Sequence, residues 1–462
     1  MGVPMTFGTP KDQPPLIYKP NTTKPDVHRL QTRPDIKMLM LRHKIADAAS
    51  SPLIRGASAY LASEAAAKVS RLAVVVAMAR FLSPLEIGIA AAAMAGSDIL
   101  KSLAENGVGQ RIIIANDGEL DAVTKRAHQI FWVWCTGLTV LQIAVGAGVW
   151  LAGGSIMTFA LMALLGLEYL FMPGGLVQCA LAMRKGMLAR TAAVSGAQNV
   201  SANLLTVVLV ALFPSPLAVV LPKLMSAPVW LIGMRRLVHW RPAPGVAPAP
   251  LSAFTRFGAS VLGIEFVKAL RAQADKLIVG AVLGTEALGI YFFAFNAGVG
   301  ISTSLATALS TVLFPYLSTS GDRVLALKRG LTLAMTAITA VALAQSMAAS
   351  SYVSLVFGDK WASVAPLVAI LCLTAIPNML WSVTAQWLRS GGRADQELAL
   401  SLIAGAAITV TAFVAAPHGL TVLAWATLAA AILVQATISL PVLVKAFGAN
   451  AGTRNTTALQ GA

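Results

Sequence analysis

Charged side chains stand inside apolar segments of this sequence, where a charge is costly. Glu64, Lys68 and Arg71 are spaced i, i+4 and i+7, so in a helix they share one face. At roughly 2.5 to 3.5 kcal/mol for each charge at the centre of a membrane helix, exposing several of them to lipid would cost as much as a whole domain gains by folding. These side chains are therefore expected to face water, a partner charge or a ligand.

Two further apolar segments carry interior charge. In the first of them, Asp98 and Lys101 share one helical face with Glu105. The second spreads its charges over a broader arc and contains Glu265, Lys268, Arg271, Asp275 and Lys276. The segment with Glu265 resembles the one with Glu64 in this respect, and both place charges of either sign at a similar depth in the membrane.

The residue types indicate a chemistry for these positions. Arginine is always protonated, and its planar fork of donors suits phosphate oxygens. We therefore predict that Arg71, Lys268 and Arg271 face a cavity in which an interior arginine binds a pyrophosphate. The acidic residues expected to balance this charge, or to take up a proton or sodium ion, are Glu64, Asp98, Glu265 and Asp275. The alternative is that the charges form salt bridges between helices, with Lys223 and Lys276 snorkelling.

The elements that position these charges must be membrane helices. Of 462 residues, 57% are hydrophobic and only 12% are charged, with a mean hydropathy of +0.73, whereas soluble domains are about 25% charged. The apolar segments are continuous, which excludes the strands of a membrane barrel, because such strands alternate polar and apolar residues. Twelve segments are long enough for a helix to cross about 30 Å of hydrocarbon. They are residues 53–79, 86–110, 129–152, 156–180, 191–213, 216–234, 257–283, 286–314, 329–350, 363–388, 396–416 and 419–444.

Basic residues between the segments predict the orientation. About 25 lysines and arginines fall on the side shared with the N-terminal tail, against about two, Arg80 and Lys360, on the other. This asymmetry predicts that both termini are cytoplasmic. It also accounts for most of the net charge of +16 without a nucleic-acid partner, because basic loops lie against anionic lipid headgroups.

The segments divide into two similar halves. An offset of 201 residues superposes Glu64 on Glu265 and Gly88 on Gly289, and six crossings return the chain to its starting side, so the repeats are predicted to be parallel. The predicted order is a disordered cytoplasmic tail, a six-helix lobe, a proline-rich linker, a second six-helix lobe and a cytoplasmic C-terminal tail. Their bounds are 1–52, 53–238, 239–254, 255–445 and 446–462.

No constellation for catalysis is visible. The three cysteines and five histidines are scattered, and no phosphate-binding GxxxxGK[ST] loop occurs. External loops are short, which argues against a polymerase or ligase that must hold an acceptor. We therefore predict that the protein is not an enzyme and has no metal or cofactor.

Several turns carry a resemblance. These are Phe81-Leu82-Ser83-Pro84-Leu85-Glu86-Ile87-Gly88, Ala274 to Gly280 leading into Leu283 to Tyr291, Leu313-Phe314-Pro315, and Phe357-Gly358-Asp359-Lys360-Trp361 followed by Pro366. Over about residues 55–445 the sequence resembles the polysaccharide transport family of flippases. These turns are shared across a wider superfamily that includes drug antiporters and peptidoglycan-precursor flippases.

The resemblance implies an all-α membrane protein of twelve helices, with two lobes arranged as in multidrug and toxin extrusion transporters. It implies alternating access that moves undecaprenyl-diphosphate-linked oligosaccharide across the bacterial inner membrane for exopolysaccharide, capsule or O-antigen assembly. A polysaccharide polymerase and co-polymerase are the implied protein partners. Family members present a cationic cavity, and the residues expected to bind the substrate are Lys68, Arg71, Lys101, Lys268 and Arg271.

The main alternative is a cation-coupled efflux antiporter for drugs or metabolites, with the same architecture. Such pumps favour interior acids. Here the charged segments hold as many bases as acids, and Lys223 adds one more base. The balance favours an anionic cargo.

Overall fold

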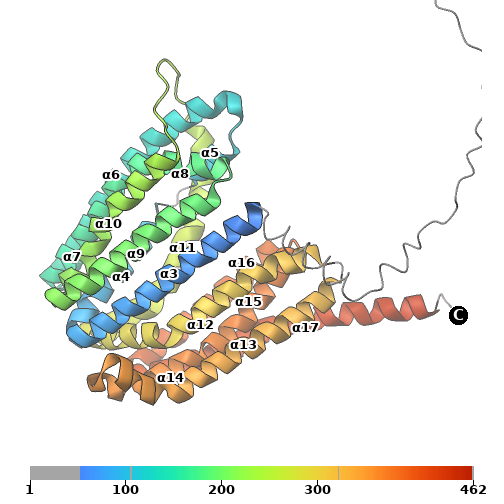
Figure 1. The fold of residues 1–462 in the computed structure, drawn as a ribbon. Coiled ribbons are helices and arrows are strands. Elements are labelled where there is room, and N and C mark those ends of the chain that lie inside the picture. The colour runs from blue at the N-terminus through green and yellow to red at the C-terminus, as the bar shows by residue number, and fades with distance from the viewer. Residues whose placement is uncertain (1–51, 105–106, 321, 460–462) are drawn as a thin grey trace, which may run out of the picture. The chain divides into compact units, whose positions relative to one another are not determined.

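The computed structural model describes residues 52–104, 107–320 and 322–459, and all regular structure in these ranges is helical (Figure 1). The helices of the first half are α3 (Pro52–Phe81), α4 (Pro84–Ser102), α5 (Val108–Ile114), α6 (Leu120–Leu151), α7 (Ile156–Gly166), α8 (Pro173–Arg184), α9 (Leu188–Leu212) and α10 (Pro216–Leu237). Those of the second half are α11 (Ser252–Val282), α12 (Thr285–Thr319), α13 (Arg323–Tyr352), α14 (Ala365–Leu373), α15 (Ala375–Ser390), α16 (Ala394–Ala415) and α17 (Leu420–Leu459). The predicted all-α class is confirmed for these residues.

The two predicted tails differ in how much of each the structure describes. Of the two compact units into which the chain divides, Met1–Arg55 and Gly56–Ala462, the second contains most of α3 and all later helices. The predicted N-terminal tail lies outside the described residues up to position 51. At the other end, α17 continues past the predicted boundary at residue 445.

Many of these helices are long and apolar enough to cross a membrane. Within the described residues, the stretches that qualify are Asp117–Leu151, Leu188–Leu212, Pro216–Leu237, Arg323–Phe357, Asp359–Ser390, Asp395–His418 and Leu420–Gly448. Two bent pairs, Ile156–Phe171 with Pro173–Arg184 and Thr285–Gly300 with Ser302–Ser318, raise the number from 7 to 9. The helices α3, α4 and α11 are outside this set, and they carry most of the interior charges; Lys223 lies on α10, which is within the set. The count of twelve crossings stays a prediction.

The start of α4 shows why the Phe81–Gly88 turn has its sequence. Ser83 caps the helix: its hydroxyl accepts a hydrogen bond from the main-chain N–H of Glu86 (3.3 Å). The Glu86 carboxylate in turn accepts one from the Ser83 main-chain N–H (2.8 Å). Pro84 occupies the first turn, where its missing N–H costs no hydrogen bond.

The two halves meet where α4 crosses α12. A Cβ added to Gly88 would clash with the carbonyl oxygen of Thr285, and one added to Gly289 would clash with that of Pro84. Both pairs are related by the offset of 201 residues, since Pro84 corresponds to Thr285 and Gly88 to Gly289. A reciprocal contact of this kind is what a twofold axis produces. It supports the repeat that the sequence predicts.

Apart from the contacts of α4 with α11 and α12, helices pack mainly within their own half. The helices α6 to α10 gather on one side of Figure 1, and α12 to α17 on the other. One apolar core nevertheless spans both halves and includes Leu82 and Ile87 from the first, with Phe293, Phe357 and Trp361 from the second. Each of these side chains is at most 2% exposed.

The proline-rich segment between the halves is attached to the first half. Lys125 Nζ donates a hydrogen bond to the carbonyl oxygen of Val246 (2.7 Å), and Arg126 Nε donates one to that of Ala249 (2.6 Å). The main-chain N–H of Ala249 also donates to the carbonyl of Ala122 (3.0 Å). The segment predicted as a linker is therefore held against the start of α6.

Candidate functional site

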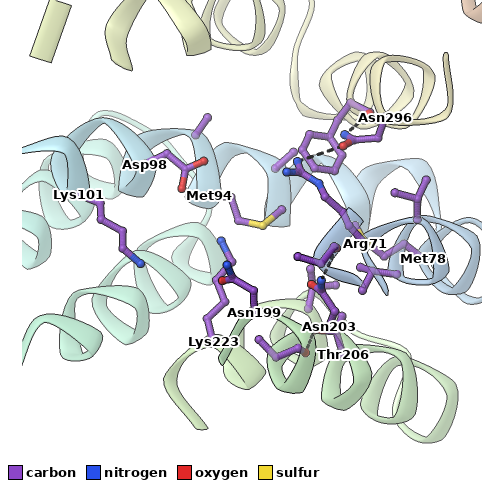
Figure 2. Close-up of a pocket in the computed structure, with 18 of the residues that line it drawn as sticks. Arg71, Met78, Met94, Asp98, Lys101, Asn199, Asn203, Thr206, Lys223 and Asn296 are labelled. Carbon is purple, nitrogen blue, oxygen red and sulfur yellow. Dashed lines mark hydrogen bonds between the residues drawn. The ribbon is translucent and has the colours of Figure 1, made fainter. Parts of the chain in front are cut away.

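A cavity of about 630 Å³ lies between α3, α4, α9 and α10 of the first half and α11 and α12 of the second (Figure 2). One end is apolar, where Val75, Met78 and Ala91 line it next to the core shared by the halves. The rest is rich in charged and polar side chains. These are Lys68, Arg71, Asp98, Lys101, Glu168, Gln198, Asn199, Asn203, Thr206, Lys223, Ser226, Gln273, Lys276 and Asn296.

Three of the lining cations have no carboxylate partner. The Arg71 guanidinium donates a hydrogen bond to the neutral side chain of Asn296 (3.2 Å; Figure 2). The ammonium groups of Lys68 and Lys223 make no hydrogen bond or ion pair within the described part of the chain. A cation at this depth is stable when water or an anion solvates it, so these three side chains are available to water or to an anionic ligand.

Two other lining cations are compensated. Lys101 Nζ lies 2.7 Å from Glu168 Oε1, and the Glu168 side chain is 9% exposed. Lys276 is buried, 3.4 Å from Asp275 Oδ1 and 4.5 Å from the ring centre of Phe295. These lysines therefore contribute less to the free positive charge than the first three.

A buried polar network holds Glu168 in place. The residue stands in the short helical turn Leu167–Phe171, between α7 and α8, which meet at 53°. Next to it, the Tyr169 hydroxyl donates to Gln142 Oε1 (2.6 Å), and Gln142 Nε2 donates to the carbonyl oxygen of Met162 (2.8 Å). Buried polar groups are stable when hydrogen-bonded, so this network fixes the bend that brings Glu168 to Lys101.

The predicted acids differ in position. Asp98 lines the cavity, and its Oδ2 accepts a hydrogen bond from Gln273 Nε2 (3.1 Å). Asp275 accepts one from the Tyr291 hydroxyl (2.9 Å) and is not a lining residue. The side chain of Glu64 and all of Glu105 lie outside the described residues.

Lys268, Arg271 and Glu265 do not line the cavity. Lys268 Nζ pairs with Glu265 Oε1 at 2.7 Å, and the Lys268 side chain is 62% exposed. Arg271 donates to the hydroxyl of Ser401 (2.8 Å) and to its carbonyl oxygen (3.1 Å) on α16. The structure therefore brings Lys68, Arg71 and Lys101 together, without the two cations predicted from the second half.

The register of the repeat explains this difference. At the offset of 201, Arg71 corresponds to Ala272, which does line the cavity, whereas Arg271 is one residue out of register. One residue turns a helical side chain by about 100°, enough to direct Arg271 toward α16. Lys268 is out of register with Lys68 by the same single residue.

Several lining residues were not predicted as site residues. Lys223 and Lys276 were named as snorkelling residues in the alternative interpretation, and Glu168 was overlooked although it is an acid within the apolar segment 156–180. The rule that singled out Arg71 also applies to Glu168. The amides Asn199 and Asn203 are uncharged, and the sequence alone does not show which way they face.

The lining as a whole favours an anionic ligand. Lys68, Arg71, Lys101, Lys223 and Lys276 stand against Asp98 and Glu168, and the remaining polar residues are amides and hydroxyls. Charge-assisted hydrogen bonds from lysine and arginine to phosphate or carboxylate are stronger than those between neutral groups.

Comparison with known proteins places this chain in a family. A family model described as "Polysaccharide biosynthesis protein" matches residues 77–366. The teichuronic acid biosynthesis protein TuaB of Bacillus subtilis (strain 168) is 27% identical over 161 residues, which are 34% of this chain and 33% of that protein. The succinoglycan biosynthesis transport protein ExoT of Rhizobium meliloti (strain 1021) is 27% identical over 311 residues, 64% of this chain and 61% of that protein. The chain thus matches less than two thirds of the length of either relative.

Solved structures share the fold. The lipid II flippase MurJ, in an inward closed conformation, superposes with a TM-score of 0.66 at 12% identity, covering 84% of this chain and 91% of MurJ. A multidrug resistance MATE family transporter in an inward-facing conformation gives 0.56 at 14% identity, covering 84% and 94%. The expected likeness to multidrug and toxin extrusion transporters is confirmed for the fold.

Proposed function

Since the chain belongs to the polysaccharide biosynthesis protein family, we propose that it is a flippase for lipid-linked oligosaccharide repeat units. In this proposal the cargo is joined to undecaprenyl diphosphate and crosses the bacterial inner membrane for assembly of a cell-surface polysaccharide. The diphosphate binds in the cavity, and the polyprenyl chain stays in lipid.

One observation carries the proposal. Lys68, Arg71 and Lys223 face a cavity between the two halves and have no carboxylate partner within the described residues. Unpaired cations inside a membrane protein are costly unless water or a bound anion solvates them. A diphosphate supplies the missing negative charge and suits the fork of Arg71.

The proposed architecture has twelve crossings in two parallel six-helix lobes, residues 53–238 and 255–445, with both termini in the cytoplasm. The reciprocal contact of Gly88 and Gly289 supports the repeat. The basic loops support the orientation. Two lobes related by a twofold axis along the membrane normal can open to one side of the membrane and then to the other. The cargo shifts the equilibrium between these two states by binding them with different affinity.

The test removes two uncompensated cations. Arg71→Ala with Lys223→Ala should lower polymer export in a complemented deletion strain by at least about tenfold, because hydrogen bonds to a charged group contribute roughly 1.5 to 3 kcal/mol each. Export is measured as surface polymer, and the amount of protein in the membrane is measured alongside it.

Lys268→Ala with Arg271→Ala is the matched control. It removes the same charge from α11 outside the cavity, and we expect export close to that of the parent. Normal export from the Arg71 and Lys223 double variant would refute the proposed binding site.

The alternative of drug efflux makes an opposite prediction. A pump for cationic drugs needs free acids in its cavity, whereas here Glu168 is paired with Lys101 and Asp98 accepts a hydrogen bond from Gln273. Deletion of the gene should therefore leave drug susceptibility unchanged while surface polymer is lost. Increased susceptibility with intact polymer would favour the antiporter.

A further inference from the structure

Helix α9 turns amide side chains toward the cavity. Gln198, Asn199 and Asn203, called here the amide stripe, line it, and Figure 2 shows Asn199 and Asn203 among the lining side chains. The side of α9 away from the cavity is apolar, with Leu204 and Leu212 55% and 64% exposed. The stripe is thus the polar face of a helix whose other face suits lipid.

The amide stripe has hydrogen-bonding capacity that the protein does not use. Asn203 Nδ2 donates to Ser70 Oγ (2.9 Å) and to the carbonyl oxygen of Ala67 (3.3 Å), and its own Oδ1 has no partner within the described residues. The side chains of Gln198 and Asn199 make no hydrogen bond in the same part of the chain. Asn199 is exposed, and Gln198 and Asn203 are half-buried, so their open donors and acceptors can be occupied by water or by a ligand in the cavity.

The chemistry of the stripe differs from that of the cations. A carboxamide offers one acceptor and two donors, and a hydroxyl both donates and accepts, so an amide can pair with neighbouring hydroxyls. It carries no charge that would select phosphate. A neutral molecule rich in hydroxyl groups, such as a sugar, is the best match.

The stripe lies next to Arg71. Asn203 is bonded to α3 at Ala67 and Ser70, and Ala67 is one helical turn before Arg71. Asn199 is one turn before Asn203 on α9, about 6 Å along the axis. The Arg71 guanidinium itself is directed toward Asn296 on α12, and Asn199 and Asn203 line the same cavity from α9 (Figure 2). A group attached to a phosphate at Arg71 would therefore lie within the cavity that the amide stripe lines.

We propose that the amide stripe binds the hydroxyl groups of the sugar joined to the diphosphate. The inference rests on the proposed function, because it takes the diphosphate to be bound at Arg71. It assigns a second role within the cavity: the cations bind what all cargoes share, and α9 distinguishes one sugar from another.

The experiment compares probes that differ only in the sugar. The full chain, purified in detergent, is titrated with farnesyl diphosphate capped as its methyl ester, called here the bare diphosphate, and with farnesyl diphosphate carrying glucose, galactose or N-acetylglucosamine. The methyl cap gives every probe the same number of phosphate charges. The parent should bind at least one sugar-bearing probe about 25-fold more tightly than the bare diphosphate, as two hydrogen bonds of roughly fivefold each would give. Asn199→Ala should lose about fivefold of that preference and keep its affinity for the bare diphosphate.

Asn199 suits this test because its side chain makes no hydrogen bond within the described residues, so removal of the side-chain amide should not disturb folding. Ser201→Ala is the matched control on α9, since the Ser201 hydroxyl donates to the carbonyl oxygen of Ala197 (2.7 Å) and does not line the cavity. It should keep the full preference. Arg71→Ala should weaken the binding of all probes alike.

The outcomes separate the two proposals. If no sugar-bearing probe exceeds the bare diphosphate, or if Asn199→Ala keeps the preference, the sugar site is refuted while binding of the bare diphosphate leaves the flippase proposal intact. If the parent binds none of the probes, the flippase proposal fails, and the sugar site with it.

Discussion

At the scale of single residues, the partner of each cation decides what that cation can do. Lys101 stands 2.7 Å from Glu168, while within the described residues the Arg71 guanidinium is hydrogen-bonded to the neutral Asn296 alone. Both positions looked equivalent as charges in apolar segments. The difference is that Lys101 is paired with a buried carboxylate, whereas Arg71 has none within the described residues, and we propose that it binds an anion.

The Lys101–Glu168 pair leads to a stability prediction. Lys101→Met leaves the Glu168 carboxylate, 9% exposed, without its counter-ion. We expect the free energy of unfolding to fall by about 2 to 4 kcal/mol, below the upper range for fully buried pairs because the Lys101 side chain is 43% exposed. Denaturant titration of the purified protein measures the loss.

The double variant Lys101→Met with Glu168→Leu provides the control, because it removes both charges. It should recover most of the stability in a double-mutant cycle. A single Lys101→Met variant as stable as the parent would show that the pair does not stabilise the fold.

At the scale of elements, close contact between α4 and α12 depends on glycine. Gly88 and Gly289 each face a carbonyl oxygen of the other helix, so neither position has room for a Cβ. Because these residues are equivalent in the repeat, one requirement appears twice in the sequence. The same register determines which side chains of α3 and α11 reach the cavity.

Gly88→Ala should weaken this crossing. The added methyl would force α4 and α12 apart, and overpacking of this kind costs about 1 to 3 kcal/mol. Thermal unfolding in detergent should show a lower midpoint than for the parent.

Gly137→Ala is the matched control for this change. Gly137 lies within α6 with nothing within 4 Å of an added Cβ, so alanine should be neutral or stabilising by up to about 1 kcal/mol. Equal midpoints for the two variants would contradict the proposed contact.

At the scale of the described helices together, hydrogen bonds join the two halves at the end where α3 finishes. Arg80 donates hydrogen bonds to the carbonyl oxygens of Leu355 and Val356, and Lys360 Nζ donates to that of Leu82 (3.0 Å). Trp361 Nε1 donates to the carbonyl of Ala79 (2.8 Å). Arg80 and Lys360 are the two basic residues predicted on the outer side, and both join the first half to the second.

Opening at this end must break those bonds. Arg80→Ala with Lys360→Ala should favour the outward-open state, because each hydrogen bond contributes about 0.5 to 1.5 kcal/mol. With Met78→Cys as a reporter inside the cavity, labelling of cells by a membrane-impermeant maleimide should become about tenfold faster.

The reporter without the two alanine substitutions gives the reference rate. The chain without Met78→Cys gives the background from the native cysteines, of which Cys135 and Cys372 are buried and Cys179 is half-buried. An unchanged labelling rate would show that these bonds do not hold the cavity closed.

The amino-acid sequence was sufficient for the properties that depend on local composition. The apolar segments, the basic loops and the 201-residue repeat are visible without coordinates, and so are the charges of α3, α4 and α11. Lys68, Arg71, Asp98 and Lys101 were identified as interior charges for this reason, and each lines the cavity.

Only the tertiary structure decided which charges meet. Arg71 and Arg271 have the same residue type and similar surroundings in sequence, yet one faces the cavity and the other faces Ser401. The reason is that a helix turns by about 100° with each residue, so the neighbours of a side chain depend on how the helix is rotated against others. Glu168 reaches Lys101, and the amides of α9 reach the cavity, through contacts between segments far apart in the chain.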